Sequence, residues 1–177
     1  MIGVSGQFGD FSEVVVKTMY KHVKMPIIFA LSNPTSKAEC KPEDAYAWTE
    51  YNCIFASGSP FKPVALPDGR IFRPGQCNNM YIFPALGLAA SLGKFIKITD
   101  SMFYYAAKKL SETVTQEDLA QRCVFPSLKR IREIESLVAT AVLEEGFKLK
   151  LARIERPSDI LAFVKKNMWY PEYAQYV

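Results

Sequence analysis

The sequence predicts an α/β fold in which a partial doubly wound parallel sheet is followed by a mostly helical C-terminal region. Two patterns carry this prediction. Short apolar segments of strand length alternate with amphipathic helical segments over residues 1–57, which is the order of a parallel α/β sheet. From residue 80 onward, apolar residues recur at spacings of three and four, which is the period of a helix.

The chain opens on what we interpret as the end of a strand. Ile2-Gly-Val-Ser-Gly leads into a turn over Gly3–Gly9, and Ser12 is the predicted N-cap of the first helix. The apolar face of that helix comprises Val15, Val16, Met19, Tyr20 and Val23. Because the first βα unit begins at the last residues of its strand, we expect the earlier part of the domain to lie upstream of Met1.

Two further strands and one helix complete the predicted sheet region. Pro26 ends the first helix, and the apolar run Ile27–Leu31 is typical of a buried parallel strand. Pro42 suits the first position of a short helix that extends to about Thr49. Cys53–Ala56 is the next predicted strand.

The remaining chain is divided between loops and helices. Ser57–Pro63 and Phe72–Asn79 are expected to be irregular loops, and Asp68-Gly69 is a turn signal between two short extended pieces. Met80–Leu92 is apolar nearly all round, which indicates a buried helix with Pro84 in its first turn. Further helices are expected to start at Thr99 or Asp100, at Thr115 with Asp118 closing a capping box, at Ser127 with an end at Gly146, and at Pro157-Ser-Asp159.

Length and composition bound the class of protein. The 177 residues allow one domain or parts of two, and a hydrophobic content of 49% is enough for a core. The net charge of +4 is concentrated in residues 147–166, which is typical of a solvated basic connector and not of a nucleic-acid binding surface. The longest apolar run, Met80–Leu92, is shorter than the ~20 residues that a bilayer requires, so no membrane partner is expected.

Cysteine and histidine usage argues against a zinc site. Cys40, Cys53, Cys77 and Cys123 are widely spaced, and His22 is the only histidine. Scattered cysteines in a core-rich chain are typical of buried thiols in a reducing compartment. No basic segment with an apolar run opens the chain, so we expect no signal peptide and a soluble, intracellular protein.

Polar residues follow two consecutive predicted strands. Asn33 comes directly after Ile27–Leu31, and Ser57-Gly58 comes after Cys53–Ala56. Ligands of open α/β sheets bind at the carboxyl ends of the strands. A side-chain amide there offers both a donor and an acceptor to a carboxamide, a hydroxyl or a carboxylate. The alternative is that Asn33 only begins an Asn-Pro turn.

Two further patterns have both a structural and a ligand-binding interpretation. The spacing Gly3-x-x-Gly6-x-x-Gly9 differs from the G-x-G-x-x-G dinucleotide motif. It suits either a tight strand-to-helix connection or a backbone that approaches a cofactor phosphate or ribose. Asn78-Asn79 suits either the cap of the apolar helix or, with that helix's N-terminus, a site for an anionic ligand.

Sets of catalytic or metal-binding residues are not apparent. No Ser/His/Asp or Cys/His arrangement can be built beyond His22, which lies at the end of an amphipathic helix. The acidic pairs are expected on solvated helix faces, and they are Glu43-Asp44, Glu133 with Glu135, and Glu144-Glu145. We therefore assign no catalytic residue and no metal ligand to this chain.

Six segments, in chain order, together resemble the malic enzyme family. They are Ile2–Gln7, Ile28–Thr35 with Ala38-Glu-Cys40, Phe55–Phe61, Pro74–Pro84, Val124–Leu128 and Asn167–Tyr173. The blocks Ser-Asn-Pro-Thr, Phe-Ala-Ser-Gly-Ser-Pro-Phe and Gly-Gln-x-Asn-Asn are long enough to be specific, and the resemblance spans the whole chain. The last segment is most similar to the tail of NAD-linked plant-type forms.

The resemblance implies a Rossmann-like fold and the oxidative decarboxylation of malate to pyruvate and CO2, with NAD or NADP and Mn2+ or Mg2+. It implies that Asn33, Asn78 and Asn79 bind the substrate. The cofactor-binding residues that it implies are Val4, Ser5, Ser32, Asn33, Gly58 and Asn78. The residue that distinguishes NAD from NADP follows an earlier strand, so the sequence leaves that choice open.

The family's general base, general acid, three metal ligands and glycine-rich fingerprint all lie upstream of the matched region, so the chain alone is predicted to be inactive. Residues 1–79 would form the C-terminal half of the dinucleotide-binding domain. Residues 80–150 would pack on the substrate and metal domain, and residues 151–177 would form a tail in subunit contact.

The resemblance also implies an assembly and a compartment. We expect a homo-oligomer, a dimer or a tetramer, in the mitochondrial matrix in preference to the cytoplasm or a plastid. Apolar surface exposed on helix 80–92 would make the isolated chain poorly soluble. An alternative from a different class is a non-catalytic truncated form that associates with a full-length malic enzyme.

Overall fold

The computed structural model describes residues 1–170, 172 and 173, and it divides into two compact units. Unit 1 comprises Met1–Asn79 together with Val114–Leu128. Unit 2 comprises Met80–Thr113 and the chain from Lys129 onward. Each unit is described by itself.

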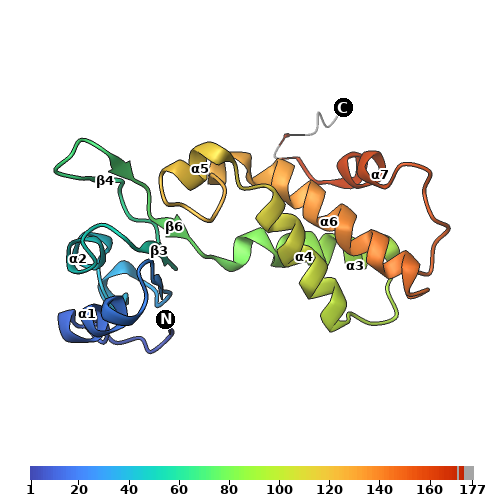
Figure 1. The fold of residues 1–177 in the computed structure, drawn as a ribbon. Coiled ribbons are helices and arrows are strands. Elements are labelled where there is room, and N and C mark those ends of the chain that lie inside the picture. Colours follow the sequence, from blue (N-terminus) through green and yellow to red (C-terminus); the bar gives the residue numbers. More distant parts are fainter. Residues whose placement is uncertain (171, 174–177) are drawn as a thin grey trace. The chain divides into compact units, whose positions relative to one another are not determined.

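Unit 1 is built on a parallel four-stranded sheet in the order β1-β2-β3-β6, part of which is seen in Figure 1. Its strands are β1 (Ile2–Gly3), β2 (Ile27–Ala30), β3 (Ile54–Ser57) and β6 (Gly75–Gln76). The register pairs Gly3 with Ala30, Ala30 with Ser57, and Ser57 with Gln76, so the strands end level with one another. The predicted α/β class, with its parallel Rossmann-like sheet, is confirmed.

Strand β6 corrects the prediction for Phe72–Asn79, which was expected to be an irregular loop. Gly75 and Gln76 pair in parallel with Ala56 and Ser57, and the N–H of Cys77 donates to the carbonyl of Ser57 at 2.9 Å. A strand of two residues is too short to produce a recognisable alternation in the sequence, and tertiary pairing alone defines it.

Helices and a hairpin complete unit 1. The helices are α1 (Glu13–His22), the 3-10 turn η1 (Thr35–Lys37), α2 (Pro42–Trp48) and α5 (Gln116–Ala120). The antiparallel hairpin β4 (Val64–Ala65) and β5 (Ile71–Phe72) surrounds the predicted Asp68-Gly69 turn. Ser12 is the N-cap of α1, Pro42 starts α2, and Thr115 with Asp118 forms the predicted capping box.

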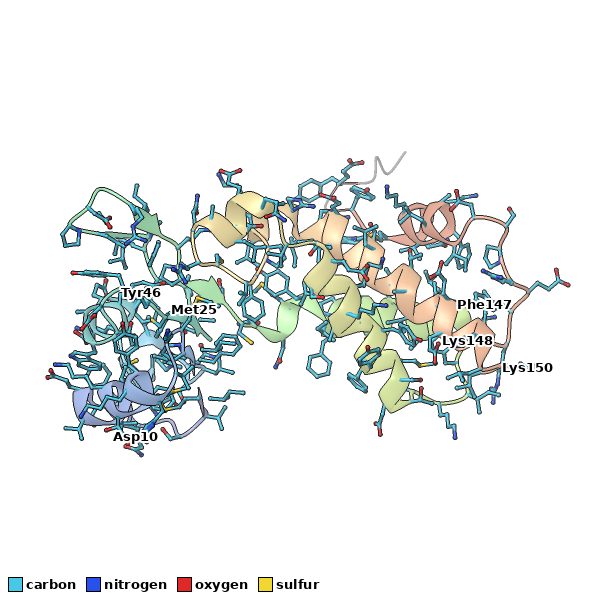
Figure 2. The ribbon with its side chains drawn as sticks, viewed as in Figure 1. Asp10, Met25, Tyr46, Phe147, Lys148 and Lys150 are labelled. Atoms are coloured by element: carbon cyan, nitrogen blue, oxygen red, sulfur yellow. The ribbon has the colours of Figure 1, made fainter. Side chains whose placement is uncertain are left out.

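The core of unit 1 lies between the sheet and its helices. Val16 of α1, Ile28 of β2 and Phe55 of β3 are fully buried. Tyr46 of α2, labelled in Figure 2, lies with its ring centroid 6.1 Å from that of Phe55 and 5.3 Å from that of Phe72. Apolar residues from separate segments therefore hold the sheet and α2 together.

Unit 2 is a helical unit centred on its longest helix. Its elements are η2 (Asn79–Tyr81, whose first residue belongs to unit 1), α3 (Phe83–Gly93), α4 (Asp100–Glu112), η3 (Leu128–Arg130, whose first residue also belongs to unit 1), α6 (Ile131–Lys148) and α7 (Ile160–Asn167). Helix α6 packs against α3, α4 and α7, and Figure 1 shows α4 and α6 running side by side. Asp159 caps α7 as predicted.

The structure corrects both predicted ends of the longest helix and excludes the interpretation of Asn78-Asn79 as a helix cap. The longest helix begins at Ile131 and not at Ser127, because a 3-10 turn precedes it, and it continues past Gly146 to Lys148. The apolar helix begins at Phe83, with Ile82 as its N-cap, so Asn78 and Asn79 do not cap it. One face of that helix is open, and the Phe83 side chain is 56% exposed, in line with the expected apolar surface.

In the described part of the chain, none of the helices is both long enough and apolar enough to span a membrane.

Candidate functional site

The predicted cofactor- and substrate-binding residues gather at the carboxyl edge of the parallel sheet. They follow β1 (Val4, Ser5), β2 (Ser32, Asn33), β3 (Gly58) and β6 (Asn78). Asn79, the remaining predicted residue, comes next in the chain as the first residue of η2, and it is exposed. The carboxyl edge is where open α/β sheets bind their ligands.

A buried carboxylate joins the loops that follow β1 and β2. The Glu39 side chain is fully buried, and its Oε1 accepts hydrogen bonds from the Ser5 N–H at 2.9 Å and the Ser5 hydroxyl at 3.2 Å. Oε1 also accepts from the Ser32 hydroxyl at 2.5 Å, and Oε2 accepts from the Ser32 N–H at 3.3 Å. Both oxygens are therefore occupied by donors from the two loops.

The hydroxyl of Ser32 links this carboxylate to the turn after β1. The Gly6 N–H donates to Ser32 Oγ at 2.8 Å, while Ser32 gives its own proton to Glu39. The hydroxyl of Ser5 is engaged in the same way, since it donates to Glu39 and accepts from the Gln7 N–H at 3.2 Å. Both predicted serines direct their hydroxyl protons into the protein.

The environment of Glu39 favours its ionised form. Burial acts to raise its pKa, but the hydrogen bonds from the Ser32 hydroxyl and from the backbone N–H groups of Glu39, Ser5 and Ser32 together outweigh that effect. The pKa of Glu39 consequently lies below its ordinary value of 4.5.

Asn33 is held against the loop that follows β3. The Ser59 hydroxyl donates to Asn33 Oδ1, and Asn33 Nδ2 lies 3.5 Å from the Leu31 carbonyl. An amide nitrogen carries two protons, so one remains for another acceptor. The Asn33 side chain is exposed, and its peptide bond to Pro34 is cis.

Gly58 lies where the loops after β2 and β3 come closest together. A Cβ atom built on Gly58 would lie 2.3 Å from the Leu31 carbonyl oxygen and 2.7 Å from Asn33 Nδ2, so only glycine fits. The Gly58 carbonyl accepts from Asn78 Nδ2 at 3.2 Å and from Gln76 Nε2 at 3.4 Å. This packing connects Asn33 and Asn78, two of the predicted substrate-binding residues, through one glycine.

The groups at this edge suit a flat ligand with both apolar and polar surface. Val4 is 77% exposed and presents an apolar side chain beside the turn of Ser5 and Gly6. Asn33 presents an amide donor at the end of the neighbouring strand. Apolar contact combined with a few directed polar groups is the usual composition of a small-molecule site.

Glu39 is the residue of this edge that the sequence analysis did not single out. In the sequence, Glu39 lies between two small apolar residues, Ala38 and Cys40, and both of these are buried in the structure. Acidic residues are rarely buried without partners, so such a flanking pattern indicates a hydrogen-bonded carboxylate.

Other titratable residues are accounted for away from the edge. Cys40, Cys53 and Cys123 are buried as predicted, but Cys77 is only half-buried. Burial raises the pKa of Cys40 to about 12 and that of Cys53 to about 11. Glu145 was expected on a solvated face, but it is only 6% exposed and pairs with Lys148 at 3.3 Å. Among the described residues, no group of three or more His, Cys, Asp or Glu could hold a metal ion.

Comparisons with known proteins agree on one family. A family model described as "Malic enzyme, NAD binding domain" matches residues 1–147. The chain is 49% identical over 173 residues to an NADP-dependent malic enzyme of Dictyostelium discoideum, covering 98% of this chain and 32% of that protein. It is 43% identical over 174 residues to the mitochondrial NADP-dependent malic enzyme of Mus musculus, covering 98% of this chain and 29% of that protein.

A solved structure agrees with these sequence relatives. The crystal structure of a malic enzyme from Pyrococcus horikoshii superposes with a TM-score of 0.58 and 26% sequence identity, over 79% of this chain and 28% of that one. The chain spans about a third of the length of the curated relatives named above. The sequence relatives, the family model and the fold together establish that this chain belongs to the malic enzyme family.

Proposed function

We propose that this chain is part of a malic enzyme that converts malate to pyruvate and CO2 with NAD or NADP, and that it supplies the loops facing cofactor and substrate. The single observation that carries the proposal is the carboxyl edge of the sheet. There, Asn33, Gly58 and Asn78 are connected by hydrogen bonds and close packing. Membership of the malic enzyme family supports the choice of reaction.

The residues at the edge fit a nicotinamide cofactor. The exposed Val4 side chain offers apolar surface to a ring, and the Asn33 amide offers a donor to a carboxamide carbonyl. When bound, the cofactor accepts the hydride that leaves the substrate. The chain's own residues contribute binding and orientation.

The Asn33 side chain is oriented by the two groups that contact its amide. The Leu31 carbonyl, 3.5 Å away, can only accept a hydrogen bond, so the Nδ2 end of the amide faces it and Oδ1 accepts from the Ser59 hydroxyl. The remaining Nδ2 proton can form one hydrogen bond at a time, to the carboxamide carbonyl of the cofactor or to a carboxylate or hydroxyl oxygen of malate. Asn78 is held through the Gly58 carbonyl, so the two amides keep a fixed spacing.

The groups that move protons and hold Mn2+ or Mg2+ are assigned in this proposal to residues upstream of the chain. That assignment follows from the family resemblance, in which the base, the acid and the metal ligands precede the matched region. The 177-residue chain with malate, cofactor and Mn2+ should accordingly form no NAD(P)H above background. Robust turnover by the chain would contradict this division of roles.

The role of the amides is tested in the complete enzyme that contains this chain. Asn33→Ala and Asn78→Ala should each lower kcat/KM for malate by at least about tenfold, which corresponds to ~1.4 kcal/mol of lost transition-state binding. Asn52→Ala is the matched control, because Asn52 lies two residues before β3, at the opposite edge of the sheet. Equal effects of all three substitutions, or none, would contradict the proposed site.

We also propose that the complete enzyme is a homo-oligomer in which residues 151–177 contact another subunit. Trp169 is 76% exposed and Tyr170 is 53% exposed, and exposed aromatic side chains are enriched at interfaces. Pro171 and the segment 174–177 lie outside the described residues. Removal of residues 168–177 should lower the sedimenting mass of the complete enzyme, and an unchanged mass would contradict the assignment.

For the compartment we propose the mitochondrial matrix. The mitochondrial malic enzymes of Mus musculus and Homo sapiens are among the relatives, as is a chloroplastic one of Zea mays. A fluorescent fusion of the complete enzyme should coincide with a matrix marker. Signal in the cytoplasm or in plastids would overturn this choice.

A further inference from the structure

We propose that Glu39 is the positioning residue of this site, because it fixes the shape of the turn after β1 and joins that turn to the loop after β2. This inference rests on the proposed function, since the positioned loops are those that would face the cofactor. We call the hydrogen-bonded set of Glu39, Ser5, Gly6 and Ser32 the Glu39 network.

The side chain of Glu39 accepts four hydrogen bonds, and all four come from the two loops. Two are donated by Ser5, through its N–H and its hydroxyl, and two by Ser32 through the same groups. A single carboxylate therefore connects residues that are 34 and 7 positions away in the chain. No neutral side chain can accept at two oxygens in this way.

The network has a fixed direction. Ser32 has one hydroxyl proton, and it gives this proton to Glu39, so the oxygen lone pairs face the Gly6 N–H. Without an acceptor at position 39 the hydroxyl could rotate, and the Gly6 N–H would lose its oriented partner. The conformation of the turn thus depends on a residue outside the turn.

The main chain of Glu39 holds the far end of the same turn. Its carbonyl accepts from the Gly9 N–H at 3.0 Å and from the Phe11 N–H at 3.2 Å. Gly6 and Gly9 have positive φ values of 71° and 88°, so the intervening backbone does not follow a regular element that would hold itself in place. Glu39 contacts the turn at its beginning and at its end.

Glu39 acts through other residues and not by contact with a ligand. It is fully buried, while Val4 and Asn33, which flank the network, are exposed. The hydroxyls of Ser5 and Ser32 are directed at Glu39, so we infer that these two serines position the backbone beside them. The ligand-facing groups of the two loops are then Val4, the turn backbone and the Asn33 amide.

The test uses Glu39→Gln and Glu39→Ala in the complete enzyme, with Glu43→Gln as the control. Glu43 lies in the first turn of α2 and is exposed. Glutamine keeps one acceptor but places an NH2 group against the Ser32 N–H, whereas alanine removes all four bonds. We expect the KM for the nicotinamide cofactor to rise about tenfold in Glu39→Gln and further in Glu39→Ala, with a smaller change in kcat.

Hydrogen exchange provides a readout that does not depend on activity. The amides of Ser5, Gly6 and Ser32 should exchange faster in Glu39→Gln, while those of β2 and β3 keep their wild-type protection. Faster exchange across the whole sheet, or unchanged exchange with an unchanged cofactor KM, would overturn the proposal. If the wild-type enzyme does not turn over malate, the proposed function is wrong. The hydrogen-exchange rates of Ser5, Gly6 and Ser32 would still decide the role of Glu39.

Discussion

Gly3 lies directly against the carboxyl group of Glu39. A Cβ atom built on Gly3 would lie 2.6 Å from Glu39 Cδ and 2.6 Å from Phe11 Cζ, distances that real Cβ atoms essentially never show. Gly3 is also paired with Ala30 in the parallel sheet, so its backbone cannot move aside without disturbing the ladder. Close approach is therefore the reason for glycine at this position.

Gly3→Ala is predicted to displace the Glu39 side chain or the Phe11 ring. Forcing one methyl group into a packed site costs typically 1–3 kcal/mol, so the denaturation midpoint of the chain should fall accordingly. In the complete enzyme the same substitution should raise the cofactor KM in the direction expected for Glu39→Gln. Urea denaturation checks the effect on stability, and steady-state kinetics check the effect on the cofactor KM. An unchanged denaturation midpoint would contradict the close packing around Gly3.

Acidification should lower the stability of the folded chain through protonation of Glu39. The pKa of this carboxyl is lower in the folded chain than its ordinary 4.5, so the unfolded state binds the proton more tightly. The stabilisation is fully present above pH 4.5 and is lost as the pH falls below that value and through the folded pKa. Urea denaturation at a series of pH values should show a steeper loss of stability on acidification for wild type than for Glu39→Gln. Parallel curves would contradict this.

Much of the fold could be predicted because its signals are local. The apolar run Ile27–Leu31 and the proline at position 42 each specify an element within a few residues, and both elements form where expected. Strand β6 and the start of α6 at Ile131 could not be read in this way. A two-residue strand is defined by its partner, and the 3-10 turn before α6 shares the apolar spacing of the helix that follows.

The residues of the candidate site also differ in whether their sequence signals are local. Asn33 and Gly58 could be predicted because they directly follow apolar strands, and a parallel sheet brings such positions to one edge. The residues that flank Glu39 indicate a hydrogen-bonded carboxylate, but its partners could not be predicted, since Ser5 is 34 residues away. The burial of Glu145 was not predicted either. Helix α6 is contacted by α3, α4 and α7, so it has less solvent-exposed surface than a helix with only one buried face.

The hydroxyl of Tyr46 is predicted to reduce stability. Among the described residues this buried hydroxyl has no hydrogen-bond partner, and burial raises its pKa. Tyr46→Phe keeps the ring contacts with Phe55 and Phe72 and removes an unsatisfied polar group, so stability should rise by up to about 1 kcal/mol. Tyr104→Phe is the control, because Tyr104 is 64% exposed and its substitution should change nothing. A lower denaturation midpoint for Tyr46→Phe would mean that the hydroxyl has a partner.

Two glycines in the helices of unit 2 are predicted to respond to alanine in opposite directions. Gly87 of α3 has open space around an added Cβ, so Gly87→Ala should stabilise the chain by about 0.5–1 kcal/mol through helix propensity alone. Alanine at position 146 of α6 would bring the same gain in helix propensity. An added Cβ on Gly146, however, would lie 2.3 Å from Cζ of the Phe95 ring.

The steric effect should prevail at Gly146. The Phe95 ring cannot move away freely, because its Cε1 also lies 2.3 Å from the Cβ position of Gly93. Overpacking of this kind costs typically 1–3 kcal/mol, which exceeds the propensity gain, so Gly146→Ala should lower the unfolding temperature. Phe95→Leu should recover part of that loss in the Gly146→Ala background, since a smaller side chain leaves room for the methyl group. If the double variant is no more stable than Gly146→Ala alone, contact with Phe95 is not the reason that α6 carries a glycine in its last turn.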